Sequence, residues 1–161
     1  MVLDLHGWTG SADNQVHESG WRHVAQTEQF VVVWPDGMGD SPNNMGSWNC
    51  SMTTGPLGPT CDTDRAAWGQ ATECYYSCPL CDEMTSCDWT SCYDDIGFIE
   101  YVIAHVGDSY CIDLDQLHLS GISNGGMFAY FVAAMATGTE RPLMTFPRVS
   151  LIWPVFQMQW D

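Results

Sequence analysis

The chain has 161 residues, and its 20 Asp and Glu residues outweigh 4 Arg, with no Lys, to give a formal charge of −16. A surface of this charge repels nucleic acid and anionic membranes, so both are excluded as partners. Apolar residues make up 45% of the chain, without a run of about 18 that would cross a bilayer. These values predict one soluble domain with an ordinary core.

The N-terminal part predicts a strand, a helix and a second strand. Met1–Leu5 and Phe30–Trp34 are short apolar runs that end at turn signals, which is typical of buried strands. Between them, residues at helical spacing predict a helix over 21–28, with Ser19 as its N-cap. Residues 38–93 hold most of the Gly, Pro and Cys without sustained periodicity, so they predict a long loop insertion.

The C-terminal part continues the alternation of strands and helices. Asp94 and Asp95 begin an amphipathic segment that predicts a helix to about residue 106, where two acids complement the helix dipole. A strand over 115–120, a helix over 125–137 and a strand over 149–153 follow. This order predicts an α/β fold with a mostly parallel sheet and flanking helices.

Seven of the eight cysteines lie between Cys50 and Cys92. An even count with irregular gaps is typical of a disulfide-linked loop in an oxidising compartment. The alternative is a zinc site, since Cys78 and Cys81 form a CxxC, but this segment has no His and no second CxxC. We expect disulfides, no metal and a secreted protein. The triplet at Asn49, a glycosylation acceptor, agrees with secretion.

The sequence Gly121-Ile122-Ser123-Asn124-Gly125, followed by Gly126, matches the G-x-S-x-G nucleophile elbow. A predicted strand precedes it and a predicted apolar helix follows it, which is the context that the elbow requires. Glycines at both ends allow strand and helix to pack closely around a strained residue. Ser123 is therefore the candidate nucleophile, and the Asn124 N–H is one candidate oxyanion donor.

A second oxyanion donor is expected from the loop after an earlier strand. His6-Gly7-Trp8 follows the first predicted strand, and its Gly-rich turn would let the Trp8 N–H face the same oxygen. His6 is expected to hydrogen-bond the loop backbone.

Five blocks in order, LDLHGWTGSADNQ, VVVWPDG, SWN, DDIGFIEYVI and GISNGGM, resemble the secreted esterases of the α/β-hydrolase fold that are related to polyhydroxybutyrate depolymerases and feruloyl esterases. The resemblance covers residues 2–155 apart from the Cys-rich insertion. It implies an α/β-hydrolase-like fold, Ser123 as nucleophile, and the Trp8 and Asn124 amides as oxyanion hole. It also implies an acid and a His after the nucleophile.

The chain departs from that pattern because all five His precede Ser123, and the acids after it are Glu140 and Asp161. The expected interpretation is a single partial hydrolase domain over residues 1–161, truncated at both ends, inactive as it stands and without its signal peptide. His118 is five residues before Ser123 on the same predicted strand, about 16 Å away along an extended chain, and cannot act as base.

The acidic pair at the start of the second predicted helix and the Trp residues each have a structural and a functional interpretation. Asp94 and Asp95 are paired carboxylates, for which a helix cap is the better explanation than acid–base catalysis. Most of the eight Trp are expected in the core, with Trp8 and Trp48 lining a cleft.

The sequence thus predicts a serine carboxylic ester hydrolase that forms an acyl-enzyme on an extracellular ester, of polyhydroxyalkanoate or feruloyl-polysaccharide type. It needs no cofactor, and its partner is an ester substrate, with polymers included. The alternative is a non-catalytic, disulfide-stabilised extracellular binding module on a hydrolase fold. A zinc-binding domain is the third hypothesis.

Overall fold

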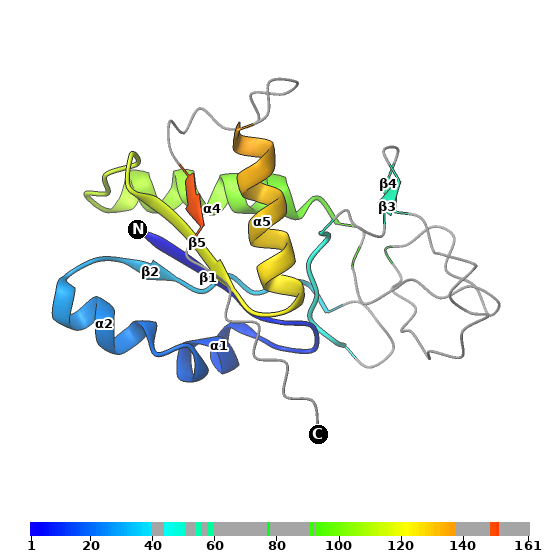
Figure 1. Cartoon of the computed structure of the whole chain (residues 1–161), viewed down its shortest axis with the longest axis horizontal. Helices are drawn as coiled ribbons and strands as arrows, with labels where there is room; N and C mark the ends of the chain where they lie inside the picture. Colours follow the sequence, from blue (N-terminus) through cyan, green and yellow to red (C-terminus); the bar gives the residue numbers. More distant parts are fainter. Residues whose placement is uncertain are drawn as a thin grey trace.

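The computed structural model describes residues 1–39, 44–50, 54–55, 58–59, 77, 91, 93–137 and 149–151. Within them lies an α/β fold with a parallel sheet in the order β2-β1-β5-β6 (Figure 1). The strands are β1 (Val2–Leu5), β2 (Val32–Val33), β5 (Leu117–Gly121) and β6 (Val149–Leu151). The helices are α1 (Ala12–Glu18), α2 (Trp21–Glu28), α4 (Asp95–Ser109) and α5 (Asn124–Thr137).

The two faces of the sheet are covered by different helices. Leu3 and Leu5 of β1 are fully buried in a core that includes residues of α4 and α5. Asp4 faces the other side, where its Oδ2 accepts hydrogen bonds of 3.0 Å from Gln15 Nε2 of α1 and from Trp34 Nε1. All of β1 is buried, as expected for a parallel strand covered on both faces.

The register of β1 and β5 sets the position of the residues that follow them. These strands are parallel neighbours, and Leu5 is aligned with Gly121. The loop after β1 and the turn after β5 therefore leave the same edge of the sheet. The fold thus brings Gly7 and Trp8 beside Ser123, although more than 110 residues separate them in sequence.

The helical region between β1 and β2 differs from the prediction. Helix α2 is present, but α1 precedes it, capped by Ser11, whose Oγ accepts from the Asn14 N–H at 3.3 Å. The prediction that Ser19 caps α2 is wrong. Ser19 instead ends α1, where its N–H donates to the Gln15 carbonyl at 3.0 Å. Gly20, with a φ of +73°, is the N-cap of α2.

The predicted bounds of α4, β5 and α5 are confirmed within a few residues. Strand β2 is present but shorter than the predicted strand. Strand β6 is also present, and residues 152–153 lie outside the described part. Two short strands, β3 (Thr54–Gly55) and β4 (Gly58–Pro59), form an antiparallel pair inside the predicted insertion. Most of the insertion, including the CxxC and six of its seven cysteines, lies outside the described residues, so the expected disulfides stay a prediction.

Candidate active site

The chain turns sharply between β5 and α5, and Ser123 lies at this turn. Its φ is +51°, in the left-handed region, which costs a residue with a side chain about 1–2 kcal/mol. The Gly125 N–H donates to the Ile122 carbonyl, and the Met127 N–H donates to the Ser123 carbonyl, each at 2.9 Å. The Ser123 side chain is exposed. A strained residue with an accessible hydroxyl between strand and helix has the geometry that a nucleophile elbow requires.

Glycines at the two ends of this turn are required by close backbone contacts. A Cβ added to Gly121 would lie 2.6 Å from the Gly125 carbonyl carbon, and 2.9 Å from the Gly126 nitrogen. A Cβ added to Gly125 would overlap the carbonyl groups of Leu5 and His6. Each contact is with backbone, which cannot rotate away as a side chain can. The turn is therefore locked against the end of β1.

The loop after β1 packs directly on the turn. A Cβ added to Gly7 would lie 3.4 Å from the Ile122 carbonyl oxygen and 3.5 Å from the Ser123 Cβ. The loop is closed by the Gly10 N–H, which donates to the Gly7 carbonyl at 3.0 Å. Thr9 has a φ of +67°. Gly7 thus lies next to Ser123, and Trp8 lines the same cleft as Ser123.

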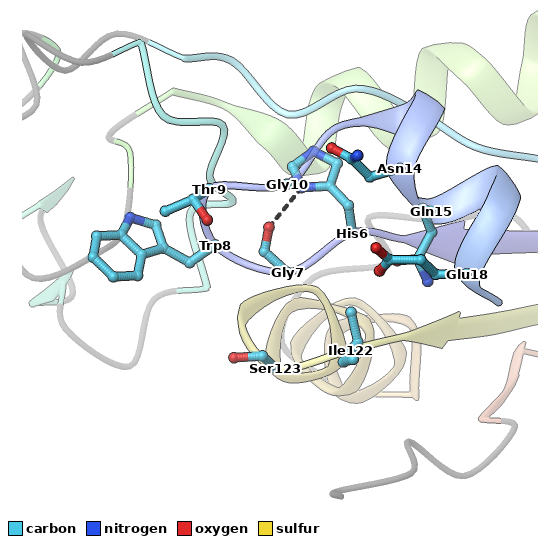
Figure 2. Close-up of a pocket in the computed structure, with 10 residues that line it drawn as sticks. All are labelled: His6, Gly7, Trp8, Thr9, Gly10, Asn14, Gln15, Glu18, Ile122 and Ser123. Carbon is cyan, nitrogen blue, oxygen red and sulfur yellow. Dashed lines mark hydrogen bonds between the residues drawn. The ribbon is translucent and has the colours of Figure 1, made fainter. Parts of the chain in front are cut away.

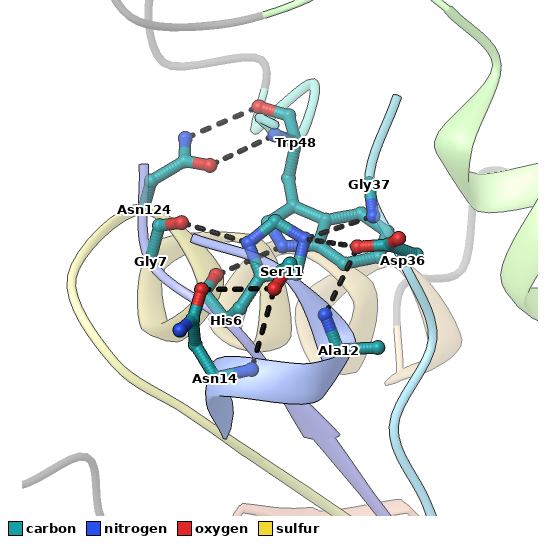
Figure 3. A network of polar contacts seen from close by, with 9 residues as sticks. All are labelled: His6, Gly7, Ser11, Ala12, Asn14, Asp36, Gly37, Trp48 and Asn124. Atoms are coloured by element: carbon teal, nitrogen blue, oxygen red, sulfur yellow. Dashed lines mark hydrogen bonds and ion pairs between the residues drawn. The ribbon is translucent and has the colours of Figure 1, made fainter. Parts of the chain in front are cut away.

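His6 is buried, and both its ring nitrogens are bonded to main-chain groups (Figure 3). The Gly37 N–H donates to Nε2 at 2.8 Å, so Nε2 holds a lone pair and the ring proton is on Nδ1. Nδ1 donates to the Gly7 carbonyl at 2.7 Å. Asp36 Oδ1 lies 3.6 Å from Nε2 and accepts the Ala12 N–H at 3.0 Å. With both nitrogens engaged, this neutral imidazole does not serve as base for Ser123.

The Asn124 side chain connects the start of α5 to the segment that contains Trp48 (Figure 3). Asn124 Oδ1 accepts the Trp48 N–H at 2.8 Å, and Asn124 Nδ2 donates to the Trp48 carbonyl at 3.2 Å. The Trp48 indole donates to the His6 carbonyl at 2.9 Å and stacks on Phe128 with ring centroids 5.3 Å apart.

Trp48 is therefore a core residue with no exposed surface, and the prediction that it lines a cleft is wrong. Its indole N–H is satisfied inside the core, so burial carries no polar penalty.

A cleft of about 400 Å³ is lined by Ser123 and its surroundings (Figure 2). One wall is residues 6–10, which include Trp8, as predicted. Ile122 lines the cleft beside Ser123, and three polar residues of α1, Asn14, Gln15 and Glu18, line the rest. These three residues were not predicted as site residues because α1 itself was not predicted. The signal that would find them is Ser11 as N-cap with an acid, Asp13, in the first turn.

In the described part of the chain, no hydrogen bond joins the Ser123 hydroxyl to a His or a carboxylate. His17 Nδ1 bonds to the Asp13 carbonyl at 2.7 Å on the exposed side of α1. His23 and His105 are exposed on α2 and α4, and His118 is on β5. In the part of the chain that the structure describes, none of the five His is therefore hydrogen-bonded to Ser123.

Asp94 and Asp95 have structural roles at the start of α4. Asp94 is the N-cap, and its Oδ1 accepts the Gly97 N–H at 3.0 Å. Asp95 is buried, and its Oδ2 accepts the Asn49 N–H at 2.6 Å and the Ser91 hydroxyl at 3.1 Å. The capping interpretation is confirmed for Asp94. Asp95 has a different structural role, because its carboxylate binds the segment that leads to Trp48.

The described residues offer neither a metal-binding cluster nor a membrane-spanning helix. They contain no group of three or more His, Cys, Asp or Glu that could hold a metal ion. None of the described helices has the length and apolar character needed to span a membrane.

The chain is similar to the bifunctional acetylxylan esterase/xylanase XynS20E of Neocallimastix patriciarum. The two are 24% identical over 130 residues, which is 81% of this chain and 13% of that protein. The chain thus spans a small part of the length of the relative that it matches. No family model and no solved structure matches the chain. The similarity indicates a distant relationship to an esterase.

Proposed function

We propose that the chain carries the nucleophile and the oxyanion-binding part of a serine carboxylic ester hydrolase of the α/β-hydrolase fold. The observation that carries the proposal is an exposed Ser123 with a left-handed backbone, packed against the Gly7 loop at the edge of a parallel sheet. The order β2-β1-β5 supports this fold, because it makes the strand before the loop a direct neighbour of the strand before the nucleophile.

In the proposed reaction, Ser123 Oγ attacks the ester carbonyl carbon to form a tetrahedral intermediate. The negative oxygen accepts hydrogen bonds from the main-chain N–H groups of Trp8 and Asn124. The carbon–alkoxide bond then breaks to leave an acyl-enzyme, and water adds to the acyl carbon and releases the acid. A base from outside the described residues, oriented by an acid partner, takes the hydroxyl proton and returns it to the leaving alcohol.

Asn124 suits the role of donor because it is the first residue of α5. The first N–H groups of a helix have no acceptor within the helix, and the helix dipole favours negative charge at this end. Removal of one oxyanion-hole donor from a serine protease costs about 2.7–4 kcal/mol of transition-state stabilisation. The bonds between the Asn124 side chain and Trp48 keep this first turn in place.

The cleft supports an ester whose alcohol carries hydroxyl groups. Asn14 and Glu18, which are both exposed, provide an amide and a carboxylate group for such hydroxyls, and Trp8 provides an apolar surface. The similarity to an acetylxylan esterase favours an acylated polysaccharide over a polyester. We accordingly propose that the protein acts outside the cell, on short acyl groups of a polysaccharide, with the Cys-rich insertion closed by disulfides.

The test is hydrolysis of p-nitrophenyl acetate and acetylated xylan by the longest natural product of the gene. Ser123→Ala should lower kcat by more than about 1,000-fold, while the melting temperature stays close to that of the parent protein. Ser120→Ala is the matched control, because Ser120 is a neighbouring serine on β5 whose hydroxyl instead accepts from Trp21 Nε1 at 3.3 Å. Hydrolysis that survives Ser123→Ala refutes the assignment.

A binding module without catalytic activity is the second candidate. The observation in its favour is that, among the described residues, no His or carboxylate is bonded to the Ser123 hydroxyl. In that case the natural protein would bind acetylated xylan without hydrolysing any ester, and Ser123→Ala would leave its affinity unchanged. Turnover that depends on Ser123 excludes this candidate.

A further inference from the structure

The Gly7 carbonyl is held by two hydrogen-bond donors. His6 Nδ1 donates to it at 2.7 Å, and the Gly10 N–H donates at 3.0 Å. Figure 2 shows this oxygen turned toward the His6 ring, while Ser123 lies on the opposite side of the loop. The oxygen is therefore fixed in one direction, away from the nucleophile.

The His6 ring is itself fixed by its surroundings. The Gly37 N–H donates to Nε2, and the residue is 1% exposed. Three glycines surround the imidazole: added Cβ atoms on Gly10, Gly37 and Gly46 would lie 3.3, 3.1 and 3.1 Å from ring atoms. The backbone therefore packs closely around the ring, and these three positions have no room for a side chain.

The direction of one carbonyl determines that of the next N–H, because a trans peptide unit is planar and its C=O and N–H point in opposite directions. We propose that His6 is the positioning residue of the oxyanion hole, which turns the Trp8 N–H toward Ser123 by holding the Gly7 carbonyl on the far side. The inference rests on the proposed function. It adds that the imidazole acts as a neutral, Nδ1-protonated donor to the loop and does not take part in proton transfer.

Two substitutions separate the two bonds of the ring. The side-chain nitrogen of Asn takes the place of Nδ1, so His6→Asn retains a donor to the Gly7 carbonyl. The terminal amide of Gln takes the place of Nε2, so His6→Gln retains an acceptor for the Gly37 N–H and loses the donor to Gly7. Both remove the buried ring, so a purely structural role would make the two variants equally defective.

In an esterase that depends on Ser123, His6→Gln should lower kcat about 10- to 100-fold with little change in KM, since a misdirected oxyanion donor acts in the transition state. The kcat of His6→Asn should be at least about tenfold higher than that of His6→Gln. Equal loss of kcat in the two variants, or a loss that appears in KM, overturns the positioning role. Hydrolysis that persists in Ser123→Ala would instead overturn the proposed function.

A spectroscopic test of the 161-residue chain is independent of turnover. Long-range ¹H–¹⁵N correlation of the His6 ring should show a protonated Nδ1 and an unprotonated Nε2. Both substitutions remove the imidazole ring current, but the backbone amide resonance of Trp8 should move further in His6→Gln, which also loses the donor to the Gly7 carbonyl, than in His6→Asn. A ring protonated on Nε2, or a Trp8 amide that responds equally to both substitutions, overturns the proposal.

Discussion

The close contact between α5 and the end of β1 makes Gly125→Ala a sharp test of the site's backbone geometry. Within an ordinary helix this substitution is stabilising, by about 1 kcal/mol of helix propensity. Here the new methyl group would overlap the carbonyl groups of Leu5 and His6. These carbonyls belong to the end of a strand paired with β5, and the Leu5 oxygen already accepts the Ile122 N–H at 3.1 Å.

The net effect follows from three contributions. Overpacking of a well-packed site costs about 1–3 kcal/mol. Displacement of α5 also weakens the bond between Ile122 and Leu5, which contributes about 1 kcal/mol. After the gain in helix propensity, Gly125→Ala should be destabilised by about 2 kcal/mol, which for a domain of this size lowers Tm by about 4–8 °C.

Gly107→Ala is the matched control, because Gly107 also lies in a helix. A Cβ there would meet Leu114 Cδ2 at 3.6 Å, an ordinary contact. This variant should be more stable than the parent by about 0.5–1 kcal/mol. Urea unfolding, followed by circular dichroism, measures both free energies. If Gly125→Ala were as stable as Gly107→Ala, the close approach of α5 to β1 would be incorrect.

Two further substitutions test the surroundings of the site. Asn124→Ala removes two buried hydrogen bonds to the Trp48 backbone and should cost about 2–4 kcal/mol in urea unfolding; a cost below about 0.5 kcal/mol would contradict the bonds described. Burial, and secondarily the charge of Asp94, raises the pKa of Glu100 above its ordinary value of 4.5. A raised pKa means that the folded state disfavours the carboxylate, so the stability that Glu100 contributes is greatest at acid pH and is lost as pH rises through the folded pKa. Glu100→Gln should therefore raise Tm near pH 7 and leave it unchanged near pH 3, and thermal melts that show a lower Tm near pH 7 would contradict this.

The turn around Ser123 could be predicted from sequence because its determinants are local. Gly121 and Gly125 flank a residue that needs a left-handed backbone, and a strand and a helix adjoin the motif. The start of α4 could be predicted for the same reason, because the capping residue Asp94 lies only three residues before Gly97, whose N–H its side chain accepts.

The features that could not be predicted from the sequence depend on contacts between segments far apart in the chain, or on weak local patterns. The burial of Trp48 is set by His6 and Phe128, which are 42 and 80 residues away in sequence. The partner of His6 Nε2 is Gly37, 31 residues later. Helix α1 has seven residues and one large apolar side chain, Val16, so it carries no hydrophobic period.

The most direct test of the proposed nucleophile is covalent labelling with a fluorophosphonate ester, which reacts with activated serines. The longest natural product of the gene should gain the mass of one phosphonyl group, and tandem mass spectrometry of its peptides should locate that group on Ser123. A label on a different serine, or an active esterase that remains unlabelled at Ser123, would contradict the account.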